Sequence, residues 1–186
     1  PWRDICILLR SAAGKATELV EALNRLDIPT FTDSRVGFLT AVEVLEFQAL
    51  LKTIYNPYDE IALLSVLRGP AFRWNEDDLL ELRAANRDAF YIDNLEKISR
   101  EQGHRLSPWA AEFLETLSRW QWESTRRSMA DLIALLYDEL HLLERAAVRP
   151  GGDQRRLNLA YLHDRARQFD RFLTKGLGAF LQFLED

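Results

Sequence analysis

The chain has 186 residues, a length suited to one ordinary domain or to one domain with a fragment of another. Its 47% hydrophobic and 28% charged residues are typical of a globular protein, and its net charge of −5 argues against a surface that attracts nucleic acid as a whole; local basic patches stay open. The single cysteine, Cys6, excludes a disulfide within the chain, and its apolar neighbours favour a buried thiol. No apolar run is long enough to span a membrane and no signal peptide is recognisable, so we expect a cytoplasmic protein.

The N-terminal part, residues 4–32, predicts a β-α-β unit. Residues 4–10 read DICILLR, a short apolar run typical of a buried strand in a parallel sheet. Residues 15–26 carry apolar side chains on one helical face, and residues 30–32 read as a second short strand. Because two strands do not make a stable parallel sheet, we expect the rest of this sheet to lie outside the chain. The opening Pro-Trp likewise indicates a piece of a longer protein.

From residue 42 onward the pattern is helical, so the predicted fold class is mainly α. Residues 42–55 form an amphipathic helix, and residues 56–82 predict a helix, a tight loop and a second helix. Gly69-Pro70 ends the first of these two helices, while Asn75 is a good N-cap for the second with Asp78 at its N3 position.

The C-terminal half predicts further helices. Residues 83–105 read as a less ordered polar stretch, and Ser107-Pro108 then opens a long helix. Ser128 caps the next helix, residues 150–152 (Pro-Gly-Gly) make a sharp break, and two helices follow, the last over 177–184.

No catalytic or metal site is recognisable from the residues alone. The sequence contains neither a Gly-x-Ser-x-Gly elbow nor a GxxxxGK[ST] phosphate loop, and its three histidines are widely separated without partners at ligand spacing. The densest acidic cluster favours helix-dipole complementation on a solvated face over the converging carboxylates of a metal-dependent nuclease. That cluster comprises Glu76, Asp77, Asp78 and Glu81.

Basic residues concentrate late in the chain. At 100° per residue, Arg156, Arg167 and Arg171 fall within about 60° of one another beside an apolar stripe. Such a ridge suits contacts with DNA phosphates, or it is a solvated face partly neutralised by Asp164 and Asp170, and we favour the second interpretation.

Three segments resemble one known family. The stretch DICILLRSAAGKATELVEALNRLDIPTFTD resembles the segment after motif IV of UvrD-like, superfamily 1A DNA helicases. GFLTAVEVLEFQALLKTIYNPYDEIALLSVLRGPAF and PGGDQRRLNLAYLHDRARQFD are similar to the AddA branch, the helicase–nuclease subunit of bacterial AddAB. The resemblance covers essentially the whole chain and is strongest at 4–82 and 149–184.

The resemblance implies a division into two parts. Residues 1–55 would be part of the RecA-like domain 2A, and residues 56–186 would be most or all of the helical insertion, domain 2B. The parent would use ATP and Mg²⁺ to unwind and degrade DNA ends in double-strand break repair and recombination. This portion would carry no ATPase or nuclease motif, would contact duplex DNA near the unwinding junction, and would lie near an AddB-like partner subunit.

One departure from the family bears on DNA contact. Where UvrD has a glycine-containing hairpin that grips duplex phosphates through backbone amides, residues 69–74 read GPAFRW, with bulky groups in place of glycines. We therefore expect DNA contact through arginine side chains. The candidate set is Arg10, Arg68, Arg73, Arg156, Arg167 and Arg171. The alternative is an all-helical protein–protein scaffold without nucleic-acid contact.

Overall fold

The computed structural model describes residues 4–10, 15–26, 28, 30, 38–171 and 176–185. Within them the chain forms ten α-helices and one short 3₁₀-helix, and none of these residues lies in a β-strand. The elements are α1 (Lys15–Asn24), η2 (Phe38–Thr40), α2 (Val42–Tyr55), α3 (Glu60–Arg68), α4 (Glu76–Ala85), α5 (Tyr91–Ser99), α6 (Ser107–Ser124), α7 (Met129–Glu139), α8 (Leu142–Ala147), α9 (Gly152–Phe169) and α10 (Leu177–Glu185).

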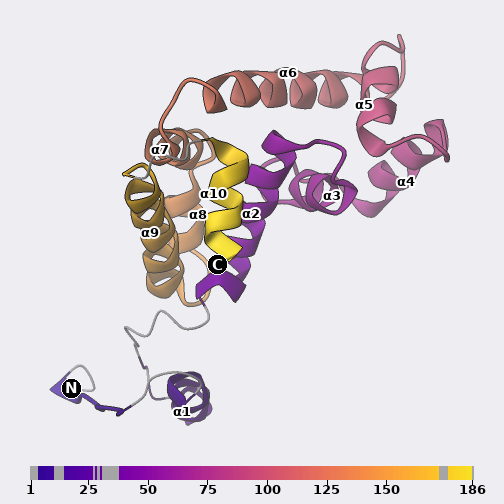
Figure 1. The fold of residues 1–186 in the computed structure, drawn as a ribbon. Helices are drawn as coiled ribbons and strands as arrows, with labels where there is room; N and C mark the ends of the chain where they lie inside the picture. Colours follow the sequence, from indigo (N-terminus) through magenta and orange to yellow (C-terminus); the bar gives the residue numbers. More distant parts are fainter. Residues whose placement is uncertain are drawn as a thin grey trace.

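The helices from α2 to α10 share one contiguous hydrophobic core. Helix α2 packs against α3, α9 and α10, and α7 and α8 pack against α9, so sequence-distant helices close one side of the body (Figure 1). On the other side, α3, α4 and α5 lead into α6, which runs back toward α7 (Figure 1). Helix α1 lies apart from this body in the same view. The fold is therefore mainly helical, as predicted.

Local capping explains where several helices begin. Asp59 accepts a hydrogen bond from the Ala62 amide at the start of α3. The predicted cap of α4 is confirmed as a full capping box, in which Asn75 and Asp78 each accept from the other's backbone amide at 2.9 Å. The predicted Ser128 cap of α7 is also confirmed, since its Oγ accepts from the Asp131 amide at 3.1 Å.

Helix α7 has a second cap that comes from the end of α9. The Asp170 carboxylate accepts hydrogen bonds from the Met129 and Ala130 amides, both at 2.9 Å. A negative charge at the helix N-terminus also complements the helix dipole. Asp170 was predicted to neutralise the arginine ridge on α9, but its carboxylate instead satisfies two otherwise unpaired amides of α7.

The β-α-β prediction is only partly matched. Its helix is confirmed as α1, which ends two residues earlier than predicted. Residues 5–9 have no regular secondary structure and Cys6 is exposed, so the predictions of a buried strand and a buried thiol are wrong for the described chain. A strand is stabilised only by hydrogen bonds to a neighbouring strand, and none adjoins this segment in the described residues. Thr30 is not helical or extended in a sheet, and residues 31 and 32 lie outside the described residues.

The stretch 83–105 is more ordered than predicted, because it contains α5. Ile92, Leu95 and Ile98 are buried at helical spacing, and this periodicity is the signal that the polar composition concealed. The start of α6 is also shifted by one residue. Leu106 holds the N-cap position, while the Ser107 hydroxyl donates to the Ser99 carbonyl at 3.1 Å.

No helix among the described residues combines the length and apolar character needed to cross a membrane.

Replacing Asp170 with alanine tests the cap that α9 supplies to α7. Loss of both amide bonds and of the charge at the helix N-terminus should lower the free energy of unfolding by about 1–2 kcal/mol. Urea denaturation measures this change. The control is Asp164→Ala, which removes only an exposed 3.7 Å pair with Arg167 and should change the free energy by less than about 0.5 kcal/mol. Equal effects of the two substitutions would contradict the role given to Asp170.

Candidate nucleic-acid interface

The loop between α3 and α4, residues 69–74, is folded back tightly against the end of α3. The Gly69 amide donates to Val66, the Arg73 amide to Gly69, and the Trp74 amide to Leu67, all within 3.0 Å. A Cβ on Gly69 would lie 3.0 Å from the Val66 carbonyl oxygen, so close approach rather than an unusual φ selects glycine there.

Two arginines hold this loop through one carbonyl. The Pro70 oxygen accepts from Arg73 Nε at 3.2 Å and from Arg145 Nη1 at 3.0 Å. Arg145 belongs to α8, so this bond joins segments 75 positions apart. Arg73 has φ of 59°, a left-handed conformation that costs about 1–2 kcal/mol for a residue with a side chain. The rest of the loop therefore holds Arg73 in a strained conformation with its side chain exposed.

The aromatic side chains of the loop point inward. Phe72 makes an edge contact with Phe113 of α6 at a centroid distance of 4.9 Å, and Trp74 is buried. Trp74 lies 6.4 Å from the ring of Trp109, which is 47% exposed. The bulky residues that replace the glycines of a duplex-binding hairpin thus anchor the loop to α6.

A groove of about 500 Å³ lies between this loop, α6 and the end of α7. We call it the loop–α6 groove. Its volume falls within the usual range for ligand sites, roughly 300–1,000 Å³. The aromatic lining is Phe72, Trp74, Trp109 and Trp120, and the charged lining is Arg73, Arg119, Arg145, Glu112 and Glu139.

One ion pair closes the far end of the groove. Arg119 binds both oxygens of Glu139, with Nη2 at 2.8 Å from Oε2, and the Trp120 indole donates to the same oxygen at 2.8 Å. The hydrogen bonds from Arg119 hold the pKa of Glu139 below its ordinary value, and the same bonds raise the pKa of Arg119. With this pair neutral, Arg73 and Arg145 outnumber Glu112, so the groove carries an excess of one positive charge.

A smaller cavity of about 60 Å³ lies on the other side of the loop, against α2 and α8. Acidic side chains of α2 bind the arginines around it. Arg155 Nη1 lies 2.8 Å from Glu43, which also accepts from Asn158, and Arg149 lies 3.2 Å from Glu46. These two arginines join α9 and the end of α8 to α2, and they are less available to an outside anion than Arg73.

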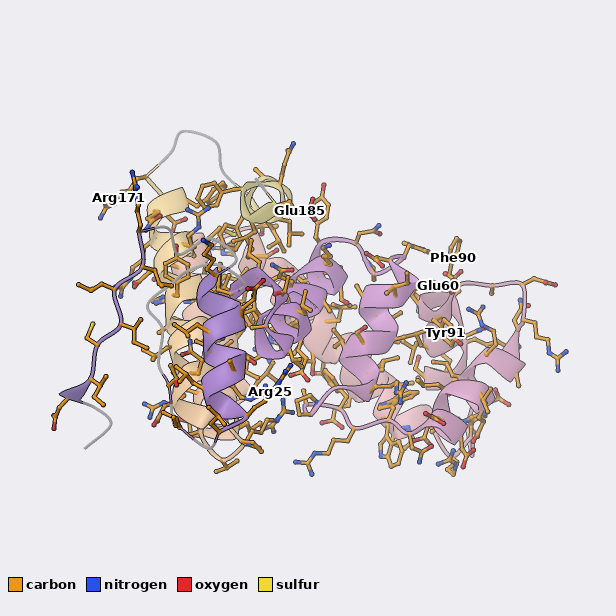
Figure 2. The ribbon with its side chains drawn as sticks, turned by 90° about the horizontal axis from the view of Figure 1, so that it is seen from below. Arg25, Glu60, Phe90, Tyr91, Arg171 and Glu185 are labelled. Carbon is orange, nitrogen blue, oxygen red and sulfur yellow. The ribbon has the colours of Figure 1, made fainter. Side chains whose placement is uncertain are left out.

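The predicted arginines fall into separate places. Arg68 and Arg73 lie together at the loop, where Arg68 also pairs with Glu76 at 3.1 Å across an exposed surface. Arg156 and Arg167 lie exposed on α9, and Arg167 pairs weakly with Asp164. Figure 2 shows Arg171 at the end of the molecule opposite Glu60. The structure therefore does not bring these arginines into one surface.

The predicted ridge on α9 is also shorter than expected. Helix α9 ends at Phe169, so Arg171 lies beyond it and does not continue the helical face shared by Arg156 and Arg167. Arg10 is exposed in the irregular N-terminal segment.

The acidic cluster on α4 is engaged in pairing. Asp78 is buried rather than solvated, because its carboxylate completes the α4 capping box and lies 2.8 Å from Arg105. Glu81 also pairs with Arg105 and lies 3.5 Å from His104. The described residues contain no group of three His, Cys, Asp or Glu side chains placed to hold a metal ion.

Two of the groove arginines, Arg119 and Arg145, were not predicted. Arg119 is detectable in principle, because Trp109, Glu112, Thr116 and Arg119 recur at helical spacing on one face of α6. Arg145 carries no such signal, since its role depends on contact with Pro70.

Comparison with known proteins identifies the class. Residues 1–171 match the family model of the UvrD-like helicase C-terminal domain. The chain therefore belongs to the UvrD-like helicase C-terminal domain family.

The individual relatives are AddA-type subunits of ATP-dependent helicase/nucleases. The relative from Heliobacterium modesticaldum is 38% identical, that from Acetivibrio thermocellus 37% and that from Geobacillus thermodenitrificans 35%. Each match covers 99% of this chain, whereas the chain spans only 14–15% of the length of these relatives.

The Glu139–Arg119 pair predicts a specific pH dependence. Because the folded-state pKa of Glu139 is below its ordinary 4.5, the pair stabilises the folded protein above that pH. The contribution is lost as pH falls through the folded-state pKa. In Glu139→Gln, the free energy of unfolding measured in urea should therefore fall less steeply than wild type between about pH 5 and pH 3.

Arg119→Ala should flatten the pH profile in the same way, and the double variant should flatten it no further than either single variant, because one interaction is removed in every case. A profile for Glu139→Gln as steep as that of the wild type would contradict the assignment.

Proposed function

We propose that this chain is a non-catalytic, DNA-guiding portion of an ATP-dependent helicase/nuclease acting in DNA repair and recombination. Its family membership and its whole-length similarity to AddA-type helicase/nuclease subunits support the class of parent protein. The observation that carries DNA contact is the loop–α6 groove, where Arg73 and Arg145 flank an aromatic lining. Duplex DNA near the unwinding junction would meet the exposed arginines of the loop, and a partner subunit would lie beside it.

The proposal divides the chain as the family does. Residues 1–55 correspond to part of the RecA-like domain 2A, and residues 56–186 to the helical insertion 2B. The uncovered Ile5 and Leu8, 64% and 91% exposed, support a neighbouring sheet in the longer protein. Helix α2 then lies at the seam, because it precedes the boundary and packs against α3, α9 and α10.

ATP and Mg²⁺ are assigned to the rest of the parent enzyme. The described residues do not fit either group, because they contain no cluster suited to a metal ion and the sequence has no phosphate-binding loop. The role proposed for this chain therefore involves neither ATP nor a metal.

A protein-interaction scaffold is the second candidate function. Tyr58 and Phe90 make an edge contact at 5.3 Å and both are about half exposed, while Ile61 is 82% exposed on α3. These side chains favour a protein partner at the α3–α5 end of the molecule. The scaffold alone predicts no DNA binding even at low salt, so a DNA titration separates the two candidates.

Replacing Arg73 with glycine tests the loop as a DNA contact. Glycine relieves the left-handed strain but loses the bond to Pro70, so the free energy of unfolding should change by less than about 1 kcal/mol. Affinity for a short blunt duplex at low salt should fall several-fold, and the salt dependence should weaken because one phosphate contact is lost. Fluorescence anisotropy with labelled duplex measures both quantities.

The matched control is His141→Gly. His141 also has a positive φ, 49°, and is exposed, but it does not line the groove. Its substitution relieves comparable strain and should leave DNA affinity unchanged. Equal losses for the two variants, or none for Arg73→Gly, would remove the loop from the interface.

The same titration tests the arginines outside the loop. If duplex DNA also follows α9, the triple substitution of Arg156, Arg167 and Arg171 by alanine weakens binding and lowers the salt slope further. Unchanged binding of the triple variant would confine the interface to the loop side.

A further inference from the structure

One face of α6 forms a wall of the loop–α6 groove. Trp109, Glu112 and Thr116 line it, followed by Arg119 one turn later, so the wall is about 15 Å long. Trp109 stands at the end near Trp74, and the neutralised Arg119–Glu139 pair stands at the other. The groove therefore has an aromatic end and a polar end.

Trp109 is placed to offer a ring face to a ligand. It is 47% exposed although it contacts the buried Trp74, so its ring is held from one side and open on another. The corresponding buried position of α6 is filled by the small Ala110, which leaves Trp109 outside the core. An exposed aromatic side chain inside a groove with excess positive charge suits a planar group attached to an anion.

The cations are held at the mouth of the same groove. The guanidinium groups of Arg73 and Arg145 both bind the Pro70 carbonyl, which fixes their positions across the groove from α6. Each guanidinium has five N–H donors and uses only one on this carbonyl, so donors remain for phosphate oxygens.

We propose that the loop–α6 groove binds an unpaired segment of DNA, with a base stacked on Trp109 and the adjoining phosphate beside Arg73 and Arg145. This inference rests on the proposed function and adds a single-stranded substrate to it. Bases in a duplex are stacked on their neighbours and present no open face, so an aromatic lining recognises only an unpaired base. Stacking on an aromatic ring together with arginine contacts to the backbone is the general basis of single-strand binding.

The test compares two tryptophans of the same helix. Trp109→Ala should weaken binding of the 186-residue chain to a labelled oligothymidylate at low salt by about tenfold, and Trp109→Phe should retain most of the affinity. Trp122, 55% exposed on α6 and outside the groove, provides the control, and Trp122→Ala should bind as the wild type does. Blunt duplex affinity should change less than about twofold in all three variants.

A second oligonucleotide isolates the base from the phosphates. An abasic strand of equal length and charge should bind the wild type several-fold more weakly than oligothymidylate, and Trp109→Ala should bind both strands equally. Loss of binding for both tryptophan variants alike, or full binding by Trp109→Ala, would overturn the proposal.

A charge substitution provides an arm that does not touch the aromatic packing. Glu112 is exposed and lines the groove, so Glu112→Gln should tighten oligothymidylate binding about two- to threefold at low salt. Glu101, exposed and outside the groove, is the control, and Glu101→Gln should have no effect. Unchanged binding of Glu112→Gln would also count against the groove.

The outcome separates this inference from the proposed function. If duplex binding depends on Arg73 while single-strand binding is insensitive to Trp109, the DNA-guiding function stands and the base-stacking groove falls. If the wild type binds neither form of DNA at low salt, both fall.

Discussion

The hydrogen bond from Arg145 to the Pro70 carbonyl is the contact on which the candidate site depends. It joins α8 to the α3–α4 loop, and it places a cation beside the groove that this loop forms with α6. Phe72 holds the same loop from the other side through its edge contact with Phe113. Without these two anchors the loop would have no fixed position relative to α6, and the strained backbone of Arg73 would have nothing to hold it.

The local features of the fold were predictable because they depend on neighbours in sequence. The Asn75–Asp78 capping box and the Ser128 cap join residues three positions apart, and their residue types show the helix starts directly. The Asp170 cap of α7 was not predictable, because it joins residues about 40 positions apart. The apolar run 5–9 looks like a strand in sequence, yet no strand pairs with it in the described chain.

The candidate site was predictable only in part. Arg73 and the departure of GPAFRW from a glycine hairpin were evident, but Trp109 was grouped with the buried stripe of α6. The structure buries Ala110 beside Phe113 instead and leaves Trp109 in the groove. A small residue carries little periodic signal, so the true core face of α6 was masked by the larger side chain next to it.

The charge pattern explains how an acidic chain can still present a DNA-binding surface. Arg149 and Arg155 bind acidic residues of α2, and Arg105 binds those of α4, so many arginines stabilise the fold. The Pro70 carbonyl, by contrast, positions Arg73 and Arg145 without neutralising them. Ultraviolet crosslinking of bound oligothymidylate, mapped by mass spectrometry, tests this account most directly. The account predicts crosslinks in residues 70–74 and 107–119, and crosslinks confined to α9 or to the α3–α5 end would contradict it.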